Sequence, residues 1–511
     1  MRAFRWRYVA KSQPAVIVVP TAIGAGVLSA TFSTASAYLV LALAFGGLAL
    51  GARSIFGGGR STPLAGANSS DLDPRMAPMA AVDEGTDTTI LGQRAPELFF
   101  YVGMLTIGLP AFRIGWATVS DLLFLAALLL SLTRPWRHSR PPPLPGLLIA
   151  GAIIYALGAL LATSTTPTPL ESLAVAARFM YLLLAWFWLA STVLSNVRKL
   201  ERAVILWVSS AALSGVGSLA QLLGIRIFEP EVDFYNRMIG FTQHPNDLGG
   251  LTGIALLPAL VLASRKGVSW HLRTFALLVL LFVAIGLLLS GSVSGLTAAV
   301  VAIAVWLSLA GRRSVFSAIP LLALVAVILL ISASINAGNI SPIRRIAATT
   351  ATDGSEGTTL WDREETNRVA LQWLSHHPFI GVGLDSASRY TSNGLEVHNL
   401  LLGAWFTTGL LGLAGMAIIL LSVFMAGRSV LKTNRGRHLW FHTSTIAAFL
   451  GSFAFAMSAP IIHQRYAWTA AALVLVCWRL NNRMTTLPDV AEMAALGRTE
   501  CSGRSIGAQP L

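Results

Sequence analysis

Long apolar runs separated by short polar connections dominate the pattern along this chain. About 14 of the runs are long enough to span, or nearly span, a lipid bilayer. They lie near 14–31, 36–52, 98–114, 116–132, 145–162, 173–195, 202–224, 246–263, 272–289, 294–310, 315–333, 398–426, 441–458 and 461–478. The pattern therefore predicts an all-α polytopic membrane protein with about 12–14 transmembrane helices.

The composition agrees with a chain that lies mostly in lipid. Of its 511 residues, 54% are hydrophobic and only 12% are charged, whereas a soluble domain carries roughly 25% charged residues. The net charge of +14 could suggest a nucleic-acid partner. The basic residues, however, lie in short clusters between apolar runs and form no basic folded domain, so we exclude that class.

The positions of the basic residues also predict how the chain crosses the membrane. With a cytoplasmic N-terminus and alternating spans, 27 of the 37 Lys and Arg residues fall on the inner side. Cytoplasmic loops are enriched in Lys and Arg. We therefore expect both termini inside and an even number of spans, with an uncleaved first helix.

Polar segments divide the chain further. Residues 53–97 and 479–511 are poor in large apolar residues, and both are predicted to be disordered cytoplasmic segments. Residues 334–397 are predicted to form a large extracytoplasmic loop. The predicted membrane regions are the N-terminal helices within 1–52, a bundle within 98–333 and the C-terminal helices within 398–478.

Part of the large outer loop is predicted to fold as an amphipathic helix. In WDREETNRVALQWLSHHP, apolar residues at 369, 370, 373 and 374 recur at helical spacing. Acidic residues occupy the first turn, where the helix dipole favours them. Pro378 ends the helix, and Gly381-Val-Gly383 follows as a turn.

The predicted topology collects a set of polar residues at the outer face. The candidates are Arg178, Arg237, His244, Asn246, Arg363, Arg368, His398 and Asn399. Arginine binds phosphate through forked hydrogen bonds and stays charged. Histidine can accept a proton near neutral pH. Arginines that bind a lipid diphosphate beside a histidine base would suit glycosyl transfer, and such a good leaving group needs no metal or other cofactor.

Each candidate also has a structural explanation. Asn399 is more simply a helix cap, His244 part of a His-Pro-Asn helix entry, and Arg368 a solvated residue on the loop helix. Arg178 could snorkel to the interface as well as serve a site. For His398 and Arg363 the alternatives are a local hydrogen bond and an ion pair with a loop acid, and for Arg237 a contact with lipid headgroups. The two cysteines form no metal or disulfide pattern.

Taken in order, the motifs resemble the O-antigen ligase and polysaccharide polymerase family. Across roughly 225–415 they are Arg237-Met-Ile-Gly-Phe with His-Pro-Asn246, a Ser/Gly turn at 290–295, Arg363 followed by His377-Pro-Phe-Ile-Gly-Val-Gly383, and His398-Asn399 with Gly409-Leu-Leu-Gly412. The sequence departs from the family pattern at Val293, where an Arg is frequent, and near Thr407, where a Glu is frequent.

The resemblance implies transfer of a glycan from a polyprenyl diphosphate carrier to a hydroxyl, without metal and with inversion at the anomeric carbon. It implies that His398 is the catalytic base and that Arg237 and Arg363 bind the diphosphate. The expected partners are this donor, a glycan or lipid acceptor and the lipid bilayer. The expected location is the bacterial cytoplasmic membrane, with the site on its extracytoplasmic face.

Other functions remain open at the level of sequence. Ligase and polymerase share the same donor chemistry, and we favour ligase only slightly. A polyprenyl-sugar glycosyltransferase of a different membrane fold would carry acidic residues in its first outer loop, near 32–36, and this chain has none there. A transporter or flippase for a polyprenyl-linked glycan would need polar groups along a path through the membrane.

Overall fold

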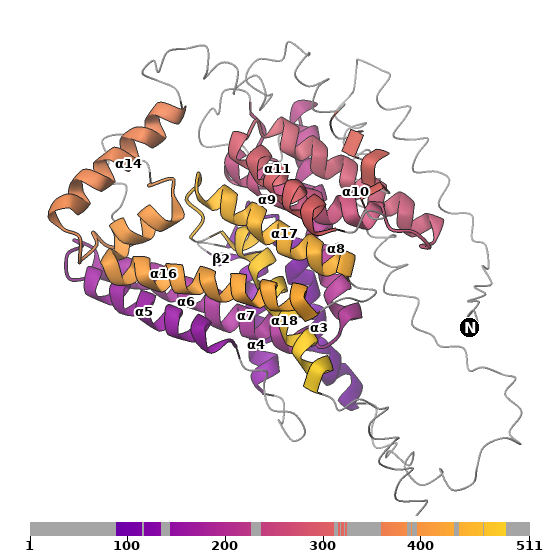
Figure 1. Ribbon diagram of the computed structural model, residues 1–511, viewed down its shortest axis with the longest axis horizontal. Coiled ribbons are helices and arrows are strands. Elements are labelled where there is room, and N and C mark those ends of the chain that lie inside the picture. The colour runs from indigo at the N-terminus through magenta and orange to yellow at the C-terminus, as the bar shows by residue number, and fades with distance from the viewer. Residues whose placement is uncertain are drawn as a thin grey trace, which may run out of the picture.

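The computed structural model describes most of the chain after its first spans (Figure 1). The described residues are 88–114, 117–133, 144–225, 237–310, 315–316, 318–320, 322–323, 326, 359–385, 390, 396–433, 439–462 and 464–486. The predicted spans at 14–31 and 36–52 lie outside these residues, as does most of the one at 315–333. The same holds for most of the two segments predicted to be disordered.

Helices make up almost all of the described chain. In order they are α3 (Thr88–Thr106), α4 (Val119–Leu132), α5 (Gly146–Ala162), α6 (Pro169–Met180), the π-helical η3 (Tyr181–Trp186), α7 (Phe187–Val193), α8 (Val197–Leu222), α9 (Pro245–Ala263), α10 (Trp270–Leu289), α11 (Val293–Leu309), α14 (Thr359–His376), α16 (Leu400–Thr433), α17 (Leu439–Ala456) and α18 (Arg465–Thr486). Two short antiparallel strands, β1 (Arg113–Ile114) and β2 (Ala117–Thr118), join α3 to α4.

The predicted class, an all-α polytopic membrane protein, is confirmed. Within the described residues, five helical segments are long and apolar enough to cross a membrane, and four shorter apolar helices accompany them. The long segments are Pro169–Val193, Val197–Leu222, Pro245–Ala263, Trp270–Leu289 and Leu400–Thr433. The total number of spans and the inside position of both termini stay predictions.

Three boundaries differ from those that the sequence predicted. Helix α3 begins inside the segment expected to be disordered, where Glu97 forms an ion pair with Lys199 at 2.5 Å. It ends before the apolar run does, because the chain turns at Gly108, whose backbone N–H donates to Ser210 Oγ at 2.7 Å. At the other end, α18 continues into the predicted cytoplasmic tail.

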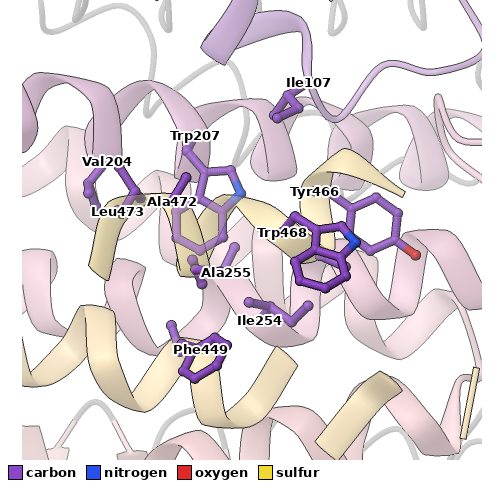
Figure 2. Packing of buried hydrophobic residues seen from close by; sticks show 14 of the residues in the cluster. Ile107, Val204, Trp207, Ile254, Ala255, Phe449, Tyr466, Trp468, Ala472 and Leu473 are labelled. Carbon is purple, nitrogen blue, oxygen red and sulfur yellow. The ribbon is translucent and has the colours of Figure 1, made fainter. Parts of the chain in front are cut away.

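The core lies around α8 and α9. Their apolar windows are 94% and 89% buried by neighbouring elements. Figure 2 shows Trp207 of α8 and Ile254 of α9 near Phe449 of α17 and Trp468 of α18. A helix that is apolar on all sides is typical of a position inside a bundle. The sequence pattern of α9 therefore agrees with its central place.

Small residues allow α5 and α16 to pack with their backbones in close contact. A Cβ atom on Gly158 would lie 2.6 Å from the backbone nitrogen of Gly412, and one on Gly415 would lie 2.4 Å from that of Tyr155. Close approach at small residues is a common way for membrane helices to associate. This contact holds α16, which carries the HN motif at its start, against the bundle.

Helix α16 is interrupted at Gly409, and the segment after α14 pairs with the interruption. Gly409 has φ 73° and ψ −170°, a conformation almost restricted to glycine. Around this break, the N–H of Leu410 donates to Phe379 O at 3.3 Å, and the N–H of Val382 donates to Phe406 O at 3.0 Å. The loop that follows α14 is thereby attached to α16.

We predict that Gly409→Ala destabilises the protein, whereas Gly427→Ala in the same helix does not. A Cβ atom at Gly409 would lie 2.2 Å from the carbonyl oxygen of Phe379. The strained backbone alone should lower the free energy of unfolding by about 1–3 kcal/mol. At Gly427 the nearest atoms to a Cβ lie at 3.5 Å, an ordinary contact.

Thermal unfolding of both purified variants in detergent measures the difference. Equal melting temperatures for Gly409→Ala and the unsubstituted protein would contradict the role of this break.

Candidate functional site

The HN motif lies at the start of α16, and its two side chains do different things. Asn399 Oδ1 accepts hydrogen bonds from the N–H groups of Leu401 at 3.1 Å and Leu402 at 3.0 Å, so Asn399 caps the helix. His398, one residue earlier, is half-buried. Its Nδ1 atom is buried and has no hydrogen-bond partner among the described residues. The cap therefore orients a turn that carries a histidine ring nitrogen able to accept a proton.

Arg237 and Asn246 are joined at the start of α9. The guanidinium of Arg237 donates from Nη2 to Asn246 Oδ1 at 2.7 Å and from Nε to the carbonyl oxygen of Ser290 at 2.7 Å. The N–H of Asn246 donates to His244 Nδ1 at 3.0 Å, so His244 caps α9, with Pro245 in the first turn. These bonds hold the guanidinium in one orientation.

The Ser/Gly turn at 290–295 lies between the two arginines of the motifs. Ser290 accepts from Arg237, and Ser294 Oγ accepts a hydrogen bond from Arg363 Nη1 at 3.1 Å. Glycine is required beneath this turn, because a Cβ atom on Gly249 would lie 2.2 Å from Ser292 Cβ. Two arginines that are far apart in the sequence thus meet one short turn.

Arg363 comes from α14, which lies at one end of the bundle (Figure 1). Arg363 contacts Ser294 in the first turn of α11, so this is the end at which α11 begins. The end of α10 lies there too, and the N–H of Met238, shortly before α9, donates to Leu289 O of α10 at 3.0 Å. The predicted topology assigns these helix ends to the outer face. The structure therefore gathers at one end the motifs that the sequence placed on one side of the membrane.

Four of these side chains form one electrostatic group, here named the Arg–His cluster: Arg237, His244, Arg363 and His398. Burial first, and then the nearby Arg237, His398 and Arg363, together lower the pKa of His244 to about 4. Burial, followed by the charge of Arg363, also lowers the pKa of His398 to about 4, although the backbone of Glu396 acts in the opposite sense. At neutral pH both rings are uncharged and both arginines are charged.

Two predicted site residues are not brought into this cluster. Arg368 is exposed on α14 and pairs with Glu365, its Nε and Nη2 donating to the two carboxylate oxygens at 3.0 and 2.8 Å. Arg178 lies on an exposed face of α6, within a candidate membrane span. The exposure of Arg368 on its helix agrees with its structural explanation, and the role of Arg178 stays a prediction.

The sequence did not single out an ion pair at the same end of the bundle. Arg465, at the start of α18, is 7% exposed and pairs with Asp121 of α4. Its Nη1 also donates to Thr118 Oγ1 at 3.1 Å and to Ser120 Oγ at 3.2 Å. Two opposite charges in separate apolar runs could have indicated this pair, because a charge inside a membrane needs a partner.

The arrangement defines a polytopic membrane protein with a cationic site at one end of its helix bundle. Residues 276–417, a little over a quarter of the chain, match the family model described as O-antigen ligase. This match supports an O-antigen ligase-like family and, in general terms, ligase- or polymerase-type glycosyl transfer. No curated protein matches the chain.

The matched region contains the Ser/Gly turn, Arg363 and the HN motif, but it begins after Arg237 and His244. The fold brings Arg237 and His244 to the Ser/Gly turn of the matched region. Within the described residues, no group of three or more His, Cys, Asp and Glu side chains is placed to hold a metal ion. The arginines and the neutral histidine of the Arg–His cluster offer anion binding next to a proton acceptor.

The lowered pKa values predict that acid destabilises the protein through these two histidines. A histidine in the unfolded chain has a pKa near 6.5, so between pH 6.5 and about 4 the unfolded state binds protons that the folded state does not. The free energy of unfolding should therefore fall as the pH falls through this range. His398→Gln should remove one of the two contributions.

Melting temperatures of the unsubstituted protein and His398→Gln, measured from pH 8 to pH 4, test this expectation. Other titrating groups are common to both proteins, so the difference reports His398 together with its effect on His244. His376→Gln, which removes an exposed histidine of α14, serves as the control. Parallel profiles for His398→Gln and the unsubstituted protein would contradict the lowered pKa.

Proposed function

We propose that this protein transfers a glycan from a polyprenyl diphosphate carrier to an acceptor hydroxyl, at the end of the bundle that holds the Arg–His cluster. The observation that carries the proposal is the convergence of Arg237 and Arg363 on one Ser/Gly turn, within electrostatic range of His244. His398 belongs to the same group. Two fixed arginines suit the two phosphates of such a carrier.

In the proposed reaction, Arg237 and Arg363 bind the diphosphate and stabilise the charge that it gains as it leaves. The acceptor oxygen forms a bond to the anomeric carbon while the bond from that carbon to the diphosphate oxygen breaks. The hydroxyl proton passes to His398, which later releases it to water. Direct displacement of this kind inverts the anomeric configuration, in agreement with the resemblance.

The charges around His398 favour its role as the base once the donor is bound. Before the donor binds, burial and then the charge of Arg363 hold the pKa of His398 low, so the ring is neutral. A bound diphosphate would offset the charge of the arginine and raise the affinity of His398 for a proton. His398 would thus become a stronger base when the donor is present.

We also propose that the site faces the extracytoplasmic side of a bacterial cytoplasmic membrane. The opposite end of the bundle carries the ion pairs Lys199–Glu97 and Arg265–Glu201. Basic residues at that end agree with a cytoplasmic position.

We predict that His398→Ala and Arg363→Ala abolish transfer while leaving an inserted protein. Loss of a general base typically costs 10²–10⁴-fold in rate, and loss of a charge-stabilising donor about 10²–10³-fold. The controls are His376→Ala, an exposed histidine of α14, and Arg273→Ala, an exposed arginine near the opposite end of the bundle. Both should retain activity.

The measurement is release of the diphosphate carrier from a polyprenyl diphosphate-linked glycan in membranes that contain the natural acceptors. Full activity of purified, folded His398→Ala or Arg363→Ala would end the proposed role of that residue.

A second prediction separates ligase from polymerase. If the protein is a ligase, its depletion leaves full-length glycan chains on the lipid carrier, because only their transfer to the acceptor is blocked. Single repeat units on the carrier would indicate a polymerase. The length distribution of carrier-linked glycan, resolved after mild acid release, gives the result. Unchanged carrier-linked glycan would contradict both forms of the proposal.

A further inference from the structure

A cleft adjoins the turn that carries His398. It is lined by Glu396, Asn399, Thr407, Leu384, Pro460 and Ile461, among others. His398 does not line it, but the residues on either side of His398 do. A ligand in the cleft would therefore lie next to the proposed base while contacting other residues.

The lining combines a few polar groups with apolar walls. Glu396 contributes a carboxylate. Asn399 uses its Oδ1 atom to cap α16, so its amide N–H groups remain the donors that it can offer. Thr407 donates its hydroxyl hydrogen to Gly403 O at 2.7 Å, and its oxygen can still accept. A carboxylate, an amide and a hydroxyl above apolar walls match the hydroxyl groups and C–H faces of a sugar.

The carboxyl group that lines the cleft carries a charge opposite to that of the arginines in the Arg–His cluster. Glu396 lies within electrostatic range of Asp247, whose Oδ1 accepts a hydrogen bond from Tyr466 at 3.0 Å. Two carboxyl groups disfavour a diphosphate, and the carboxylate of Glu396, which lines the cleft, can accept hydrogen bonds from hydroxyl groups. The cleft and the Arg–His cluster thus differ in the ligand that they can bind.

We infer that this cleft is the acceptor subsite, and that Glu396 accepts a hydrogen bond from a hydroxyl group of an acceptor sugar and so positions the reacting hydroxyl beside His398. The inference rests on the proposed function and adds the chemical class of the acceptor, a hydroxyl-bearing sugar. Glu396 is a positioning residue, because the proton goes to His398.

An apolar cavity lined by residues of α16, α17 and α18 adjoins the cleft. Leu400 and Ile461 line both, and Phe449 and Trp468 line the apolar cavity alone. A hydrocarbon chain is therefore the alternative occupant, and the test must distinguish it from a sugar.

The test uses the full-length protein in nanodiscs and an octyl glucoside that carries a diazirine on its sugar ring. After photolysis, mass spectrometry locates the labelled peptides. We expect labelling within 384–407 and 460–462, reduced about tenfold in Glu396→Gln because one hydrogen bond to a charged group is lost. Glu364→Gln, which changes an exposed carboxylate of α14, should label like the unsubstituted protein.

Two further probes separate the outcomes. A diazirine-bearing octanol, which lacks the sugar, should label the cleft weakly; equal labelling would mean that the cleft binds hydrocarbon and would overturn the inference. Farnesyl diphosphate serves as a short donor probe, and its binding should be lost in Arg363→Ala but kept in Glu396→Gln. The retained binding also shows that Glu396→Gln is folded.

The failures of the two proposals differ in this experiment. If farnesyl diphosphate binds equally well to Arg363→Ala, the proposed function fails. If it binds as expected but the glucoside labels other regions, or labels Glu396→Gln fully, only the acceptor subsite fails. Displacement of the glucoside by farnesyl diphosphate would assign the cleft to the carrier instead.

Discussion

Backbone groups that lose their helical partners inside a bundle need new ones, and this constraint connects the fold to the site. The break in α16 at Gly409 frees N–H and carbonyl groups, and in lipid no water can satisfy them. The segment after α14 does so, with Phe379 O and the N–H of Val382 as partners. Thr165 Oγ1 in turn donates to Gly381 O at 2.6 Å. The position of α14, and with it Arg363, depends on these bonds.

The second feature of the structure is the presence of groups of opposite charge near one turn. Arg237 and Arg363 meet the Ser/Gly turn. Glu396, two residues before His398, lines a cleft with mostly apolar walls. The proposed reaction brings together an anionic leaving group and a neutral hydroxyl, and these two groups of residues match the two ligands. A histidine kept neutral by burial and by Arg363 is suited to move the proton in that reaction.

Much of the fold could be predicted from the sequence, because it depends on local rules. Within the described residues, each predicted apolar run coincides largely with a helix, and the helix in the outer loop is present as α14. The role of Asn399 as a helix cap could also be predicted, because a cap accepts hydrogen bonds from N–H groups only two and three residues away. Boundaries were less predictable: α3 ends where Gly108 meets Ser210, a contact across more than a hundred residues.

The sequence by itself determined the membrane class, the helices and the set of candidate residues, because hydrophobic period and residue chemistry are local properties. Only the tertiary structure decided which candidates meet. Arg237 and Arg363 converge through Ser290 and Ser294, whereas Arg368, one and a half turns further along α14, faces away and pairs with Glu365. The packing also formed the cleft that Glu396 lines together with residues 460–462, which are distant in the sequence. Contacts between distant segments depend on how the helices pack, and no local pattern specifies that packing.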